Sequence, residues 1–117
     1  LHVVRARLLE LHRALLRAER AEHERRNGRV SDTAFLEALT ADPAFGWLRP
    51  MTSFLVALED LMDAEAELGP QDLAECARRI RALLAPEAAG EFQRRYADAL
   101  QESPDVLVAH GAVLRAL

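Results

Sequence analysis

The sequence predicts an all-α fold, a compact bundle of about five to six helices with one long N-terminal helix. Leu and Ala supply most of the apolar content while aromatic residues are only 5%, a composition that favours helices over strands. Apolar residues recur at the three- and four-residue spacing of a helix face. Pro, Gly, Ser and Asp stand between these segments, where helices begin and end. With 117 residues, of which 50% are hydrophobic, we expect a single helical domain over residues 1–117.

The first helix is expected over residues 3–26 and is the longest. Its apolar residues repeat at spacings of four, three and four, at Val4, Leu8, Leu11 and Leu15. Asn27 and Gly28 end it. A helix of about 24 residues is roughly 36 Å long, because each residue adds 1.5 Å. A domain of this size is narrower than that, so the last turns are expected to overhang the core.

A second, shorter helix is expected after Ser31 or Asp32, either of which can serve as the N-cap. It should present three apolar side chains to the core, from Phe35, Leu36 and Leu39. The segment DPAFGWLRP follows, in which Asp42 can cap a single turn. We interpret this segment as a packed elbow with an exposed surface around Trp47.

Four further helices are expected in the rest of the chain. The third begins at Pro50, the fourth opens at Pro70, and the fifth spans about 88–102. Their expected core faces are Phe54, Leu58, Leu61 and Met62 on the third, Leu73, Cys76, Ala77, Ile80, Leu83 and Leu84 on the fourth, and Phe92, Tyr96, Ala99 and Leu100 on the fifth. Ser103 and Pro104 form a strong start signal for the sixth.

Charge is distributed unevenly along a chain whose net charge is −4. Residues 1–30 hold eight Arg and four Glu, whereas residues 31–117 hold seven Arg and fifteen acidic residues. We expect the two parts to attract each other, within the fold or between subunits. No nucleic-acid partner is expected, because such proteins present a net basic face.

The compartment is expected to be the cytoplasm. One cysteine, Cys76, excludes an intramolecular disulfide, and a buried thiol is expected there. No membrane partner is expected, because no run of about 18 apolar residues exists and the N-terminal stretch is too charged for a signal peptide. The chain begins at Leu1 rather than Met, so we expect a few residues to precede it.

Three polar residues on predicted core faces are candidate ligands for a divalent metal or a small molecule. His110 lies near the middle of an expected apolar face of the sixth helix, formed by Val106, Leu107, Val113, Leu114 and Leu117. His12 and Glu19 lie on the core face of the first helix. Inward-pointing Glu and His build such sites in helical bundles, although the Glu-x-x-His spacing of di-metal bundles is missing.

The alternative interpretation makes these histidines structural. A core histidine needs only a backbone or side-chain partner for its ring. At the overhanging end of the first helix, Glu22, His23 and Arg26 would then be polar because they meet water or a second subunit. We therefore assign Trp47, Glu22, His23 and Arg26 to an expected interface.

The stretches LHRALLRAERAEHERRNGRVS, DPAFGWLRP and SPDVLVAH resemble a family of small uncharacterised all-helical proteins from GC-rich proteobacteria. The resemblance covers nearly the whole chain. It implies a helical fold and a bacterial cytoplasmic setting, and no activity is known for that family. The family pattern has an aromatic residue where this chain has His23, which weakens His23 as a ligand.

The sequence favours a non-enzymatic helical protein-interaction module that self-associates. We expect its partner to be a second copy in a homodimer, and we expect no cofactor. The overhanging end of the first helix and the surface around Trp47 are the expected contact regions. A bundle that binds a metal or small ligand through His12, Glu19 and His110 is the alternative.

Overall fold

The structure is a computed structural model that describes residues 1–117, apart from the side chain of Glu65. Its helices are α1 (His2–Asn27), α2 (Asp32–Ala41), α3 (Arg49–Asp63), α4 (Pro70–Leu83), α5 (Glu91–Glu102) and α6 (Pro104–Ala116). Two short 3-10 helices, η1 (Pro43–Leu48) and η2 (Glu65–Glu67), lie on either side of α3. Within this described part of the chain there is no strand. The all-α fold with one long N-terminal helix is confirmed.

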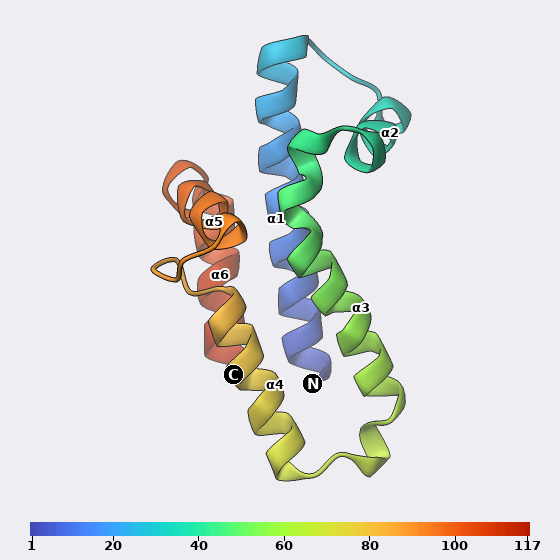
Figure 1. Ribbon diagram of the computed structural model, residues 1–117, viewed down its shortest axis with the longest axis vertical. Helices are drawn as coiled ribbons and strands as arrows, with labels where there is room; N and C mark the ends of the chain where they lie inside the picture. The colour runs from blue at the N-terminus through green and yellow to red at the C-terminus, as the bar shows by residue number, and fades with distance from the viewer.

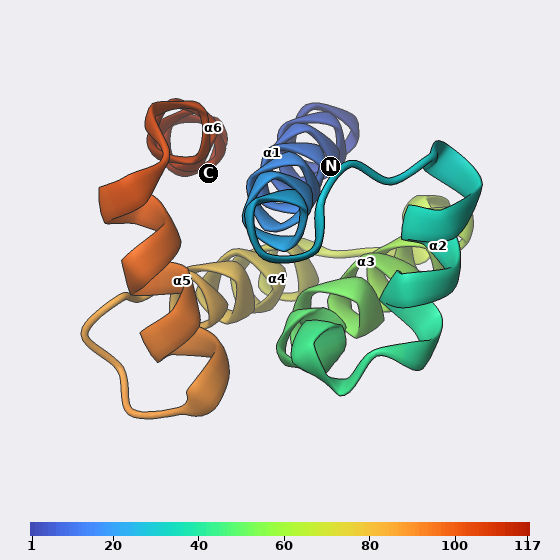
Figure 2. The ribbon, with the colours of Figure 1, turned by 90° about the horizontal axis from the view of Figure 1, so that it is seen from above.

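The helices pack in two layers along an elongated molecule of 48 × 28 × 22 Å. α1 and α6 lie in one layer, and α3 and α4 lie in the other (Figure 2). The N-terminus of α1 and the C-terminus of α6 lie at the same end of the molecule, so the two helices are antiparallel (Figure 1). At the other end, α1 extends past α5 and α6, as expected from its length (Figure 1).

α6 makes the most extensive helix–helix contact in the fold, and its partner is α1. The side of α6 that packs inward repeats at spacings of three, four and three. Val106 and Val113 on this side are fully buried, and Ala109 and Ala116 are partly buried against the core. This is the spacing of core positions in paired helices, and alanine at every second position lets the two backbones approach closely.

α1 meets this surface with small residues of its own. Ala14 is only 2% exposed, and Ala18 packs against the core one turn further along. The large apolar side chains Leu8, Leu11 and Leu15 are fully buried beside them. α1 therefore presents large side chains to the centre of the bundle and small ones along one flank.

The predicted core face of the sixth helix is wrong at two positions. Leu107 is 54% exposed and Leu114 is 42% exposed, although both were expected inside. The prediction centred the buried side on the valines and leucines by their helical spacing, whereas α6 buries Val106 and Val113 together with its alanines. Close contact between the two helix backbones outweighs the burial of two leucines.

The helix starts agree with the predicted caps. The Ser31 hydroxyl accepts a hydrogen bond from the Ala34 N–H at 3.1 Å, and the Asp42 carboxylate accepts one from the Ala44 N–H at 2.9 Å. Ser103 accepts from the N–H of Val106 at 3.3 Å. Each bond satisfies a backbone donor that a helix start leaves free.

Three further predictions about single elements are wrong. Leu36 is 63% exposed, because the main contact of the short α2 is with η1 on its other side. Leu73 is 44% exposed, because the first turn of α4 lies beyond the N-terminal end of α1 (Figure 1). α5 begins at Glu91 rather than near Ala88, since Gly90 has a φ of 154°, which a helix cannot continue through.

We expect Ala14→Leu to lower the free energy of unfolding by about 1–3 kcal/mol, because a larger side chain forces α1 and α6 apart. Urea unfolding followed by circular dichroism measures the change. Ala6→Leu is the matched control, since Ala6 is exposed on the same helix, and its effect should stay within about 0.5 kcal/mol. Equal effects of the two substitutions would contradict close packing at Ala14.

Candidate functional site

A cleft lies at the overhanging end of α1, between α1, η1, α5 and the start of α6. Its volume is about 720 Å³. It is lined by Glu19, which the sequence proposed as a ligand, and by Glu22, Arg26 and Trp47, which the sequence assigned to an interface. Ser103 and Pro104, at the start of α6, also line it. The cleft exists because α1 continues past the corner where α5 turns into α6.

Glu19 is the half-buried carboxylate of this cleft. Burial raises its pKa above the usual value of a glutamate, because a charged carboxylate loses hydration there. The indole N–H of Trp47 and the positive charge of Arg95 oppose this effect by stabilising the carboxylate. Glu19 therefore joins α1 to η1 and lies close to α5.

The expectation of an exposed surface around Trp47 is wrong. The Trp47 side chain is only 5% exposed. Its ring packs against Phe92 of α5 at 5.7 Å between centroids, and the guanidinium of Arg95 lies 6.0 Å from the ring centre. An indole has one polar N–H group on a large apolar ring system, and in Trp47 the apolar ring system packs η1 against α5.

The two walls of the cleft carry different charge patterns. On α1, Glu22 forms ion pairs with both Arg25 and Arg26, the second at 3.0 Å. On α5, Asp98 and Glu102 line the opposite wall, and neither forms an ion pair with the side chains that the structure describes. The α5 wall therefore carries two carboxylates, unpaired among the described side chains, beside Arg95, opposite a wall whose arginines are already partly neutralised.

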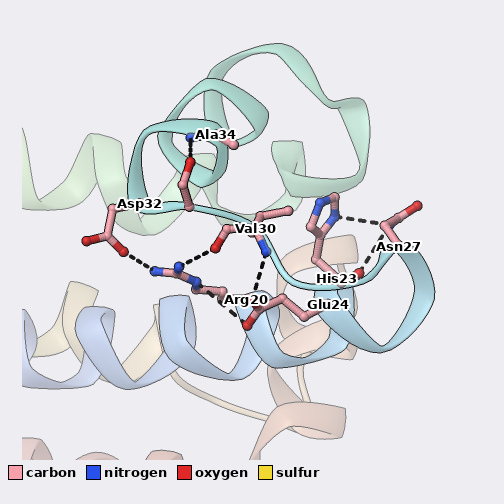
Figure 3. Close-up of polar contacts among 8 residues, drawn as sticks. Arg20, His23, Glu24, Asn27, Val30, Asp32 and Ala34 are labelled. Carbon is pink, nitrogen blue, oxygen red and sulfur yellow. Dashed lines mark hydrogen bonds and ion pairs between the residues drawn. The ribbon is translucent and has the colours of Figure 1, made fainter.

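His23 does not line the cleft, and its ring packs against η1. Its ring lies 5.6 Å from the ring of Phe45, and the Asn27 amide lies 3.3 Å from its Nδ1 atom (Figure 3). His23 therefore helps to hold the elbow against α1 and does not line the cleft with Glu22 and Arg26.

Arg20 is a structural residue that the sequence analysis missed. Its guanidinium donates to the Val30 carbonyl and to the Asp32 carboxylate, both at 2.7 Å (Figure 3). It also lies 5.3 Å from the centre of the Phe35 ring. Beside it, Glu24 accepts a hydrogen bond from the Val30 N–H at 3.0 Å. The two residues fix the turn from α1 into α2, and only the fold brings these groups within reach.

His110 is a packed histidine with one defined partner. Its Nδ1 atom lies 2.6 Å from the hydroxyl oxygen of Tyr96, which is fully buried on α5. Burial lowers the pKa of His110 and raises that of Tyr96, so the neutral forms of both are favoured. In these forms the two groups share one hydrogen bond, and the tautomer of the imidazole decides whether the tyrosine oxygen or Nδ1 donates. The contact joins α5 to α6.

His12, Glu19 and His110 are not brought together as a metal site. Among the described residues, no group of three or more His, Cys, Asp and Glu side chains could hold a metal ion. Glu19 interacts with Trp47, His110 is bonded to Tyr96, and His12 is half-buried with its pKa lowered by burial. The candidates occupy separate environments because they lie on different parts of α1 and on α6.

Cys76 has the surroundings of a core thiol. It is 5% exposed on α4, and burial raises its pKa. A raised pKa keeps the sulfur protonated, which is the unreactive form. The buried thiol expected from the sequence is confirmed.

No helix of the described chain is long and apolar enough to cross a membrane. No protein-family model, curated protein or solved structure matches the chain.

We expect Glu19→Gln to stabilise the fold at neutral pH, because it removes a carboxylate that burial disfavours while leaving an oxygen for the Trp47 N–H. A carboxyl group whose pKa is raised on folding stabilises the folded state at pH values below its unfolded pKa, here 4.5. This stabilisation is lost as the pH rises through the pKa of the folded state, so the wild type lacks it at neutral pH. The gain in melting temperature should therefore be present at pH 7 and should vanish near pH 4. Thermal unfolding at both values measures it.

Glu10→Gln is the matched control, since Glu10 is exposed on the same helix and should show no such gain at pH 7. A Glu19→Gln variant that is less stable than the wild type at pH 7 would show that the charge of Glu19 is favourable in the fold.

Proposed function

We propose that the chain is a non-enzymatic helical interaction module that binds a second copy of itself. The observation that supports this most strongly is an apolar surface on the layer formed by α1 and α6. Four of the seven large hydrophobic side chains that are exposed belong to these two helices. They are Val3 at 60%, Leu107 at 54%, Val108 at 69% and Leu114 at 42% exposed.

Single exposed apolar residues are common on proteins, but a set that recurs at helical spacing on one short helix is not. α6 has only 13 residues, and three of its large apolar side chains remain in water although its other side is packed. Burying such a side chain contributes about 1.5–3 kcal/mol. Contact with the same surface of another copy would bury several of these side chains at once. In a two-fold symmetric dimer, each such contact occurs twice.

The polar groups support a structural rather than a catalytic role. Tyr96 occupies a ring nitrogen of His110, and the Cys76 thiol is buried in its protonated form. Arg20 and Glu24 hold the turn between α1 and α2. The buried thiol also suits a reducing bacterial cytoplasm, the setting that the family resemblance implies.

A small-ligand module is the second candidate, and the cleft favours it. A volume of about 720 Å³ lies in the range of small-molecule sites, and Glu19 and Trp47 line it. An organic cation would suit the carboxylates of Asp98 and Glu102, which are unpaired in the described part of the chain. Calorimetric titration with amines and guanidines tests this, because binding should be lost when both acids are removed together, by Asp98→Asn and Glu102→Gln.

We expect the protein to form a dimer in a concentration-dependent manner. Sedimentation velocity should show a single boundary that shifts from the monomer mass of 13.0 kDa toward twice that value as the concentration rises from about micromolar to about millimolar, the range of weak association. The apolar surface remains attractive at high salt, so 1 M salt should leave the dimer in place. A 13.0 kDa particle at every concentration would contradict self-association.

A further inference from the structure

We infer that the second copy docks antiparallel on the outer face of α6, with the two α6 helices side by side about a two-fold axis. This inference rests on the self-association proposed above and names its surface and direction. The outer face consists of Leu107, Val108, Gly111, Leu114 and Arg115, at the spacing i, i+1, i+4, i+7 and i+8 of one helix side. It lies opposite the buried Val106 and Val113.

The middle of the outer face is suited to close contact. Gly111 stands there without a side chain, with Leu107 one turn before it and Leu114 one turn after it. A Cβ atom at this position would lie 3.1 Å from a terminal nitrogen of Arg115, so the arginine side chain extends back along the face. When the Arg115 side chain turns from Gly111 toward Asp105 of a second copy, the partner helix can approach at Gly111 and place its own leucines against those of the first.

The charges at the two ends of α6 select the direction of pairing. Asp105 lies in the first turn and Arg115 in the last turn, both exposed. Neither forms an ion pair with the side chains described in the structure, so both charges are available to a partner. An antiparallel pair brings Arg115 of one copy close to Asp105 of the other, at both ends. A parallel pair would place like charges together and align the helix dipoles unfavourably.

The same arrangement places Leu107 of one copy beside Leu114 of the other. The midpoint between Asp105 and Arg115 falls at position 110, close to the midpoint between the two leucines. One two-fold axis therefore satisfies both the apolar and the charged contacts. None of the residues of the outer face lines the cleft at the end of α1.

Cysteine cross-linking tests the surface and its direction. Leu107→Cys and Leu114→Cys are prepared as separate proteins, one carrying an additional tag so that mixed and identical dimers differ in mass. Both leucines are exposed, so neither substitution should change the helical content by circular dichroism. We expect oxidation of the mixture to give mainly the mixed dimer, at least about fivefold over either identical dimer. Parallel pairing would reverse this ratio and overturn the inference.

Two controls keep the result specific. Leu36→Cys places an equally accessible thiol on α2, where Leu36 is 63% exposed, and it should cross-link only at the background rate. Wild-type protein, whose Cys76 is buried, should not cross-link. If the variants sediment as dimers but give no mixed product, the α6 contact is wrong and self-association stands. If the wild type is a monomer at all concentrations, both proposals fail.

Discussion

The close packing of α1 against α6 is the contact on which the other features of this protein depend. It joins the two ends of the chain, and its small residues, Ala14 on α1 and Ala109 and Ala116 on α6, let the helices lie near each other. Leu8, Leu11 and Leu15 of α1 are fully buried, and α3 and α4 form the layer that faces α1 (Figure 2). The chain thus uses its alanines to bring two helices together and its leucines to fill the core between the layers.

The rotation of α6 about its own axis follows from that contact and explains two further observations. Turning the alanine side toward α1 brings His110 beside Tyr96 of α5, where its Nδ1 atom and the tyrosine hydroxyl form a hydrogen bond at 2.6 Å. The same rotation leaves Leu107 and Leu114 in water. One packing preference therefore gives both the structural role of the histidine and the apolar surface proposed for self-association.

The sequence predicted the elements of the fold well because their signals are local. Ser31, Asp42 and Ser103 cap helices through bonds that reach two or three residues along the chain. The rotation of α6 was not predictable in this way, because hydrophobicity ranks leucine above alanine whereas close packing prefers the smaller side chain. The same reason applies to Trp47, whose burial depends on Phe92 and Arg95 from a helix 45 or more residues away in the chain.

The sequence analysis named several residues of the cleft but assigned them to two different roles, Glu19 to a ligand set and Glu22, Arg26 and Trp47 to an interface. Glu19, Glu22, Arg26 and Trp47 do line one cleft, because the long first helix extends past the corner of α5 and α6. His12 and His110 lie elsewhere. Periodicity indicates that a residue faces the core but not which neighbour it meets there, and the choice between a shared site and separate partners depends on tertiary contacts.

Native-state hydrogen exchange tests the central contact most directly. If the α1–α6 pair is the most stable unit, the slowest amides should be those of α1 around Leu8–Leu15 and of α6 around Val106–Val113, and both should exchange with the free energy of global unfolding. The amides of α2, which packs mainly on η1, should exchange faster. Fast exchange in α6 while α1 remains protected would show that the two helices do not form one unit, and would contradict this account.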